Sequence, residues 1–154
     1  MRRAVITGMG VISCLGENAA EVLASLQEGK SGISAKEDYK EMGLKSQVAG
    51  QIHIDPKEHI DRKHLRFMST PAVYAYIAMQ QAIEDAQLAE DDVSNPRTGL
   101  IMGAGGIPGD KFVESVDILR NQGVPQMGPY RGTQNMNTPV PPRPANPRQT
   151  QGPT

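Results

Sequence analysis

The sequence predicts an α/β domain with a mostly parallel sheet and flanking helices, and three observations lead to that class. A short β-branched run at residues 3–7 stops at a glycine, and residues 95–106 contain a turn and a second apolar run that ends in glycines. Both runs are typical of buried strands. Apolar residues at helical spacing follow each run. The expected order, strand–helix–loop–helix–strand–helix, is the order in which a parallel sheet alternates with helices.

The first helix is expected between Asn18 and Gly29. Asn18 can cap its N-terminus, and Glu21 stands at the position that completes a capping box. Gly29 suits the positive φ that commonly ends a helix. Residues 30–60 are charged and broken by glycines, which predicts a long connection with a short strand at residues 48–54.

Two more helices are expected further along the chain. The apolar positions of the first recur at helical spacing and are mostly small: Met68, Ala72, Ala75, Met79, Ala82, Ile83 and Ala86. Ser69 is its expected N-cap, and Pro71 lies in the first turn, where a missing N–H costs little. The small residues predict close packing against another backbone. Residues 109–120 predict an amphipathic helix whose apolar side holds Phe112, Val113, Val116 and Leu119.

Residues 123–154 differ in composition from the rest of the 154-residue chain. They contain no Ile, Leu, Phe, Asp or Glu, and they hold eight of its 12 prolines. Such a segment cannot bury enough apolar surface to offset its ordering entropy. We therefore expect a folded domain over residues 1–122 and a disordered tail with some polyproline II character over residues 123–154.

Composition also excludes several classes of function. The tail carries three arginines, so the overall charge of −1 leaves residues 1–122 mildly acidic, which is not typical of a nucleic-acid surface. No stretch approaches the roughly 20 apolar residues of a membrane helix, so we expect no membrane association and a cytoplasmic location. A single cysteine excludes an intrachain disulfide, and the three histidines lack metal-ligand spacing. No metal site is expected.

The glycines near the N-terminus do not fit a nucleotide-binding loop. A dinucleotide fingerprint needs G-x-G-x-x-G, but Gly8 and Gly10 are followed by Ser13 at the third position. Residues 29–31 (GKS) match the end of a phosphate-binding P-loop, but Ala24 stands where its first glycine belongs. No nucleotide, and no other cofactor, is expected.

Cys14 is the chain's candidate thiol nucleophile. A reactive thiol needs a pKa lowered by a helix N-terminus or by a paired histidine. Cys14 precedes the helix expected at Asn18, so the helix dipole is not excluded, but no histidine lies near it in the sequence. We favour the interpretation of Cys14 as a small, half-buried residue in a turn.

Four blocks of sequence resemble the opening of the β-ketoacyl-[acyl-carrier-protein] synthases, in particular the bacterial type I condensing enzymes of fatty-acid synthesis. In order, the blocks are RRAVITGMGVIS, EVLASLQEGKSGI, DRKHLRFMSTPAVYAYIAMQQAIEDAQL and NPRTGLIMGAGG. The resemblance runs over about residues 1–120. It implies a thiolase-like fold of two similar halves per subunit, of which this chain is an incomplete N-terminal half, and a homodimer of subunits.

The resemblance also implies an activity, the decarboxylating condensation of an acyl thioester with malonyl-acyl carrier protein. In that family a cysteine takes the acyl chain from the carrier protein, and two histidines stabilise the enolate formed when CO₂ leaves. The family's cysteine and histidines come after the position matched by Thr154, so Cys14 is not the nucleophile. We expect no catalytic residue in this chain and no condensing activity from it alone.

The resemblance places three residues in the family's acyl pocket. Gly106 and Ile107 match positions that line or gate the pocket, and Met136 matches a residue that the family contributes across the dimer interface. Acyl carrier protein is the expected partner. An alternative function is a non-catalytic partner subunit of an intact condensing enzyme, because some relatives of the family lack the nucleophile and act in a heterodimer.

Overall fold

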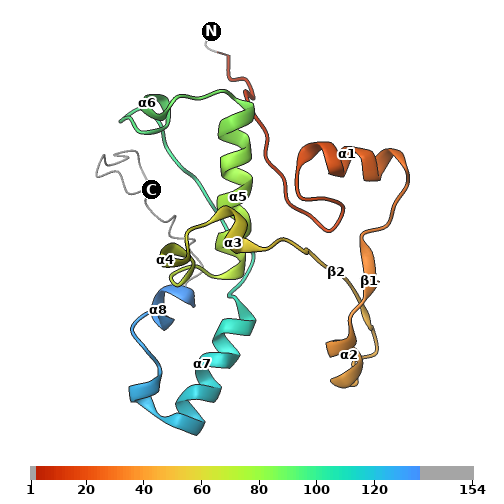
Figure 1. The fold of residues 1–154 in the computed structure, drawn as a ribbon, viewed down its shortest axis with the longest axis vertical. Coiled ribbons are helices and arrows are strands. Elements are labelled where there is room, and N and C mark those ends of the chain that lie inside the picture. Colours follow the sequence, from red (N-terminus) through yellow and green to blue (C-terminus); the bar gives the residue numbers. More distant parts are fainter. Residues whose placement is uncertain (1–2, 136–154) are drawn as a thin grey trace. The chain divides into compact units, whose positions relative to one another are not determined.

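The computed structural model describes residues 3–135 and combines helices with a small sheet, in keeping with the α/β class (Figure 1). In chain order its elements are α1 (Ala19–Gln27), β1 (Ile33–Ala35), α2 (Glu37–Glu41), β2 (Val48–Gly50), α3 (Pro56–His59), α4 (Arg62–Leu65), α5 (Thr70–Asp85), α6 (Glu90–Val93), α7 (Gly109–Gln122), the 3-10 turn η1 (Val124–Gln126) and α8 (Arg131–Gln134). The chain forms two compact units, one of residues up to 55 with 78–87 and one of 56–77 with those from 88 onward. Within the described part, no helix is long and apolar enough to cross a bilayer.

In the first unit, α1 begins and ends as its sequence predicts. Asn18 Oδ1 accepts the N–H of Glu21 at 3.0 Å, which satisfies one of the free donors at the helix start. The carboxylate of Glu21 accepts the N–H of Glu17 at 2.9 Å, so the capping box closes one residue before the cap. Gly29, just after the helix, has a φ of +66°. The predicted cap and the predicted positive φ are both confirmed.

The sheet of the described part has two antiparallel strands. Ile33 pairs with Gly50, Ser34 with Ala49 and Ala35 with Val48. The strand expected at residues 48–54 is confirmed over its first three residues, and β1 was not foreseen. The expected mostly parallel sheet is not formed among residues 3–135, because neither of the two runs predicted to build it is a strand.

The prediction of a buried strand at residues 3–7 is wrong for this structure. No strand is formed there, and the Ile6 side chain is 93% exposed. Further along the same segment, backbone N–H groups donate hydrogen bonds to side chains of α5 and not to a neighbouring strand. The N–H of Met9 donates to Asp85 Oδ2 at 2.9 Å, and the N–H of Val11 donates to Gln81 Oε1 at 3.1 Å.

The small residues of α5 pack closely against the backbone of the N-terminal segment. A Cβ built on Gly8 would stand 2.6 Å from Ala86 N, and one built on Gly10 would stand 2.9 Å from Ala82 N. Real Cβ atoms essentially never come so near to backbone atoms, so only glycine fits at both positions. The predicted close packing of this helix face against another backbone is confirmed.

The second unit has its apolar core around the start of α5. Its buried apolar residues are Ile60, Met68, Ala72, Val73 and Ile77. The helix begins at Thr70, directly after Ser69, the expected N-cap, whose carbonyl accepts the N–H of Val73 at 3.0 Å.

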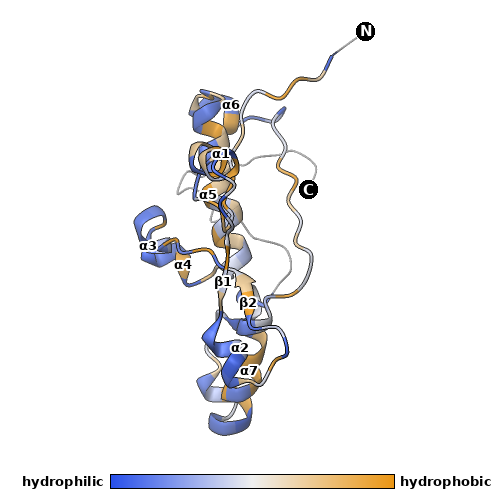
Figure 2. Ribbon diagram, turned by 90° about the vertical axis from the view of Figure 1, so that its right-hand side faces the viewer, coloured by the Kyte–Doolittle hydropathy of each residue, from blue (hydrophilic) through white to orange (hydrophobic). Residues whose placement is uncertain are grey.

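Residues 95–106 contain no strand, so the second strand prediction is also wrong for this structure. The Ile101 side chain is 94% exposed. The helix predicted at residues 109–120 is present as α7, and its ribbon carries both hydrophobic and hydrophilic residues (Figure 2). On its expected apolar side, Phe112 and Val113 are exposed. Residues 95–106 do not form a strand because a strand needs a paired neighbour, and no strand of the described residues pairs with them.

The expected tail begins with some local structure. Residues 124–126 form η1 and residues 131–134 form α8. Residues 136–154, where most of the tail prolines stand, lie outside the described residues. Disorder of the whole tail therefore stays a prediction.

Candidate functional site

Cys14 occupies a tight turn before α1. The backbone groups of Ser13 and Gly16 bond in both directions across it, at 3.0 and 3.3 Å. Its side chain is half-buried. A Cβ on either Gly32 or Gly50 would come within 2.9 Å of its sulfur, so backbone closes in on the thiol from two segments. The predicted half-buried turn position of Cys14 is confirmed.

Gly106 and Ile107 end the loop that leads into α7. Both residues are exposed, Ile107 by 54%, and a Cβ on Gly106 would meet no atom within 4 Å. The next residue, Pro108, is buried, and its carbonyl accepts the N–H of Phe112 at 3.0 Å. The first turn of α7 is thus anchored at the buried Pro108, and the two residues before it are exposed. Met136 lies outside the described residues, so the grouping of the three pocket residues stays a prediction.

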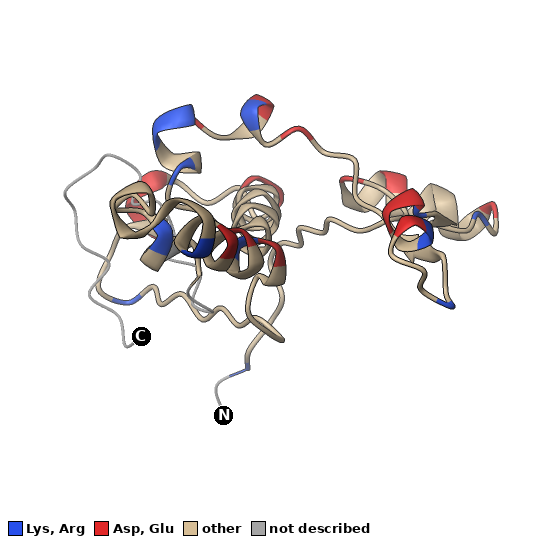
Figure 3. Cartoon of the chain, turned by 90° about the horizontal axis from the view of Figure 1, so that it is seen from below, with Lys and Arg blue, Asp and Glu red and all other residues tan. Residues whose placement is uncertain are grey.

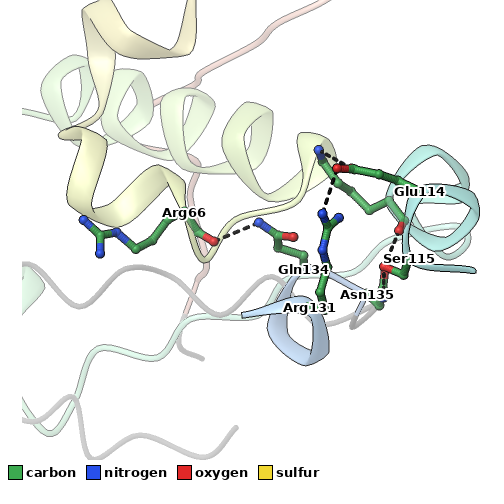
Figure 4. Close-up of polar contacts among 7 residues, drawn as sticks. Arg66, Glu114, Ser115, Arg131, Gln134 and Asn135 are labelled. Carbon is green, nitrogen blue, oxygen red and sulfur yellow. Dashed lines mark hydrogen bonds and ion pairs between the residues drawn. The ribbon is translucent and has the colours of Figure 1, made fainter. Parts of the chain in front are cut away.

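A polar cluster joins α7 to the segment around α8 (Figure 4). Glu114 on α7 accepts a hydrogen bond from Arg131 Nη2 at 2.8 Å and another from Lys111 Nζ at 3.1 Å. The buried Ser115 hydroxyl donates to the Lys111 carbonyl at 2.7 Å and accepts from Asn135 Nδ2 at 3.0 Å. We call these five residues the α7–α8 cluster.

The cluster fixes the charge of its carboxylate. Hydrogen bonds from Arg131 and then Lys111 hold the pKa of Glu114 at about 2, well below its ordinary value of 4.5. The same bond raises the pKa of Arg131. A carboxylate that is so strongly ionised and bonded to two cations is a weak proton acceptor near pH 7. The arrangement is suited to holding structure and unsuited to acid–base catalysis.

The other side of this segment is bound to the turn between α4 and α5. The Tyr130 ring stands edge-on to Phe67 with centroids 4.6 Å apart, and the Arg66 guanidinium lies 5.9 Å from the Tyr130 ring centroid. Gln134 Nε2 donates to the Arg66 carbonyl at 2.9 Å. Residues 130–135 are therefore held from both sides.

Sequence reasoning missed the α7–α8 cluster. The i, i+3 spacing of Lys111 and Glu114 is a recognisable signal of a helix ion pair. Arg131, however, stands 17 residues beyond Glu114, and no local pattern links them.

The second unit also carries two hollows. The smaller, of about 230 Å³, is mainly apolar and is lined by Pro56, Lys57, Leu65, Met68, Thr70, Val73, Tyr74 and Lys111. The larger, of about 500 Å³, is lined by Lys57, Arg62, Leu65, Arg66 and Tyr130. Gly106 and Ile107 line neither of these hollows.

The larger hollow lies on a positively charged stretch. Residues 56–66 carry four lysines and arginines but only two carboxylates, and this excess of cations is what we call the basic surface: Lys57, Arg62, Lys63 and Arg66 (Figure 3). Lys63 pairs with Asp61 at 3.4 Å. Over the described ranges, no three His, Cys, Asp or Glu side chains gather as metal ligands.

Comparison with protein families gives one match that covers the chain. Residues 1–154 match the model described as the N-terminal domain of beta-ketoacyl synthase. Curated relatives include 3-oxoacyl-[acyl-carrier-protein] synthase 1 of Haemophilus influenzae, 52% identical over 141 residues, and that of Escherichia coli K12, 46% identical over 138 residues. The matches cover 91% and 88% of this chain but only 35% and 34% of the relatives. The chain thus spans about a third of their length.

Solved structures of similar fold agree with these matches. A beta-ketoacyl synthase from Burkholderia phymatum has a TM-score of 0.76 and 25% identity, over 92% of this chain and 35% of its own. The ishigamide ketosynthase/chain length factor has a TM-score of 0.75 and 26% identity, over 88% of this chain and 34% of its own. The thiolase-like fold expected from the sequence is confirmed.

Proposed function

This chain belongs to the beta-ketoacyl synthase family, and from that membership we propose that its protein serves fatty-acid synthesis by condensing an acyl thioester with malonyl-acyl carrier protein, with loss of CO₂. The observation that carries the proposal is the family match over residues 1–154, together with 52% identity to a 3-oxoacyl-[acyl-carrier-protein] synthase. The reaction needs a thiolate to hold the acyl group and hydrogen-bond donors at the developing enolate.

Residues 1–154 alone do not catalyse this reaction in our proposal. By the resemblance, the family's nucleophile and its two enolate-stabilising histidines match no residue here, and Cys14 lies half-buried in a tight turn. Purified chain incubated with acyl- and malonyl-carrier protein should yield no β-ketoacyl product by mass spectrometry. Any β-ketoacyl product would overturn this part of the proposal, and a Cys14→Ala variant is the matched control that shows whether the Cys14 thiol is needed to form it.

Gly106, Ile107 and Met136 belong to the acyl pocket in this proposal. Two observations support it for the first two: a Cβ on Gly106 would meet no atom within 4 Å, and Ile107 is an apolar residue that is 54% exposed. An acyl chain would contact both. In the protein expressed from its complete gene, Gly106→Leu should shift product lengths downward, whereas Gly99→Leu, in the same loop, should not.

Acyl carrier protein is the proposed partner, and the basic surface is the proposed place of contact. Its support is the uneven charge of residues 56–66, which would complement an acidic partner and favour fast association. Arg62→Glu with Lys63→Glu should weaken carrier-protein binding about tenfold, and salt should weaken parental binding in the same direction. Lys36→Glu with Lys40→Glu, in the first unit, is the control. Equal losses in both variants would contradict the proposal.

A second candidate is the non-catalytic partner subunit. One observation favours it, namely the structural similarity to a ketosynthase/chain length factor. The first candidate, the condensing enzyme, would form a homodimer. For both candidate functions, a role of α7 in subunit contact is supported by its exposed apolar residues Phe112, Val113 and Leu119. Co-expression with an intact synthase separates the two: a complex of fixed stoichiometry favours the partner subunit, and self-association alone favours the homodimer.

A further inference from the structure

The two hollows of the second unit are neighbours on one surface, because Lys57 and Leu65 line both of them. Their linings differ in chemistry. The smaller hollow is lined by two of the buried apolar residues of the unit, Met68 and Val73. Three of the five residues that line the larger hollow are lysine or arginine. An apolar recess therefore adjoins a cationic one.

The smaller hollow has the size and the lining for part of an alkyl chain. An apolar cavity of about 150 Å³ is large enough to bind benzene. This hollow has about 230 Å³, and Pro56, Leu65 and Tyr74 add apolar surface to that of Met68 and Val73. Several methylene groups that leave water for such a lining gain the free energy of the hydrophobic effect.

The larger hollow, of about 500 Å³, has the charge for an anionic head group. Its cations are Lys57, Arg62 and Arg66. The ion pairs formed within residues 3–135 involve neither of the two arginines, so no carboxylate in direct contact neutralises them there. The planar guanidinium of arginine matches a carboxylate, to which it can donate two parallel hydrogen bonds.

We propose that the two hollows together bind a fatty carboxylate of medium chain length, with its alkyl chain in the smaller hollow and its carboxylate in the larger. Lys57 and Leu65, which line both hollows, then lie where the chain meets the head group. This site differs from the proposed acyl pocket, because Gly106 and Ile107 line neither hollow. Its ligand also differs from an acyl thioester, which carries no negative charge at the end of its chain.

Decanoate is the probe, titrated into the 154-residue chain below its critical micelle concentration and followed by calorimetry. It should bind saturably with one molecule per chain. Octanoate, which is two methylene groups shorter, should bind about fivefold to tenfold more weakly. Decanol, which has the same chain and no charge, should also bind about tenfold more weakly. The absence of saturable binding, or equal affinity for decanoate and decanol, would overturn the proposal.

A pair of charge-removing variants locates the head group. Arg62→Gln with Arg66→Gln should weaken decanoate binding about tenfold, because two cations of the larger hollow are lost. Arg97→Gln with Arg120→Gln is the matched control, since it removes the same charge from the second unit at residues that line neither hollow. The control should change the affinity by less than about twofold. Equal losses in both double variants would show a response to net charge alone and would overturn the site.

NMR of the chain with labelled methionine methyl groups locates the alkyl chain. A nuclear Overhauser effect is expected between the terminal methyl group of decanoate and the methyl group of Met68. Met42, an exposed methionine of the first unit, is the internal control and should show none. An effect at Met42 without one at Met68 would overturn the placement of the chain.

One consequence rests on the proposed function. Lys57, Arg62 and Arg66 also belong to the basic surface proposed to contact acyl carrier protein, so bound carboxylate and carrier protein would compete. In the protein expressed from its complete gene, decanoate at ten times its own Kd should raise the Kd for carrier protein about tenfold, and decanol at the same concentration should raise it less. An unchanged Kd would overturn the competition. If carrier protein does not bind at all, the proposed function fails, whereas the carboxylate site still stands or falls on calorimetry.

Discussion

Two segments with similar sequences behave differently in this structure. Residues 8–12 and residues 99–106 are both glycine-containing apolar stretches: the first follows one predicted strand, and the second lies within the other. Gly8 and Gly10 lie against the backbone of α5, and side chains of the same helix accept the N–H groups of Met9 and Val11. A Cβ on any glycine of the second segment would meet nothing within 4 Å.

The difference shows what a glycine-rich apolar run specifies by itself. It makes the backbone accessible to close approach, but the approaching element decides what forms there. In the first segment that element is a helix with small residues facing it, so the backbone donors bond to Gln81 and Asp85. In the second, no atom of the described residues approaches the glycines within 4 Å of where a Cβ would stand, and no strand pairs with the run. The two segments have the same kind of local sequence, and they differ in the element that packs against their backbone.

The largest expected effect is the difference in stability between adding a methyl group to a glycine of the first segment and adding one to a glycine of the second. A Cβ on Gly10 would lie 2.8 Å from Ala78 C and 2.9 Å from Ala82 N, so Gly10→Ala should lower the free energy of unfolding by about 3 kcal/mol through overpacking against backbone. Gly103→Ala enters open space and should be neutral or stabilise by up to about 1 kcal/mol. Urea unfolding followed by circular dichroism compares them. Equal losses would break the distinction between the segments.

The next effect concerns the polar contacts of the first segment. The Gln81 amide accepts the N–H of Val11 at 3.1 Å and donates to the Glu17 carbonyl at 2.6 Å, so it joins two points of the segment to α5. Gln81→Ala should cost about 1–2 kcal/mol, because two backbone groups lose their partner. Gln80→Ala, one residue earlier on the helix, should cost less than about 0.5 kcal/mol.

Hydrogen exchange distinguishes this from a general effect on α5. In Gln81→Ala the N–H of Val11 should lose protection more than the amides of the helix itself. If helix amides lose protection to the same extent, Gln81 supports the helix and does not anchor the segment.

A smaller effect is expected where the first segment passes into α1. Asn18→Ala removes the acceptor for the Glu21 N–H and should destabilise the first unit by about 1 kcal/mol. Asn18→Asp keeps a capping oxygen and should restore most of this stability. Thermal unfolding by circular dichroism measures both variants. A loss in Asn18→Asp as large as in Asn18→Ala would show that the cap oxygen is not the stabilising group.

The helices and the strands differ in how far sequence could predict them. The cap at Asn18, the end at Gly29 and the periodicity of α5 are local signals, and each appears where expected. The runs at residues 3–7 and 95–106 have the composition of strands, but pairing is a property of two segments, which a single run does not encode. The ion pair of Glu114 with Arg131 escaped notice for the same reason, since it depends on how the chain returns.

The smallest expected effect is a loss of stability at low pH, which should arise from an ion-paired carboxylate of the second unit. The pKa of Glu114 is about 2 when folded, below its ordinary 4.5, so its ion pairs contribute stability above about pH 4.5 and lose it as pH falls from 4.5 toward 2. Because this carboxylate is partly exposed, the loss should be about 1 kcal/mol or less. The bonds of the Gln81 amide in the first unit do not titrate in this range.

Carbon-detected NMR of the Glu114 carboxyl provides the measurement. Its midpoint should lie near pH 2 in the parent chain and move upward in Arg131→Gln, because the leading cause of the lowered pKa is the bond from Arg131. Lys111→Gln should move it less. A parental midpoint near 4.5 would mean that the pair between α7 and α8 does not persist in solution, and then the second unit would hold residues 130–135 by its neutral contacts alone.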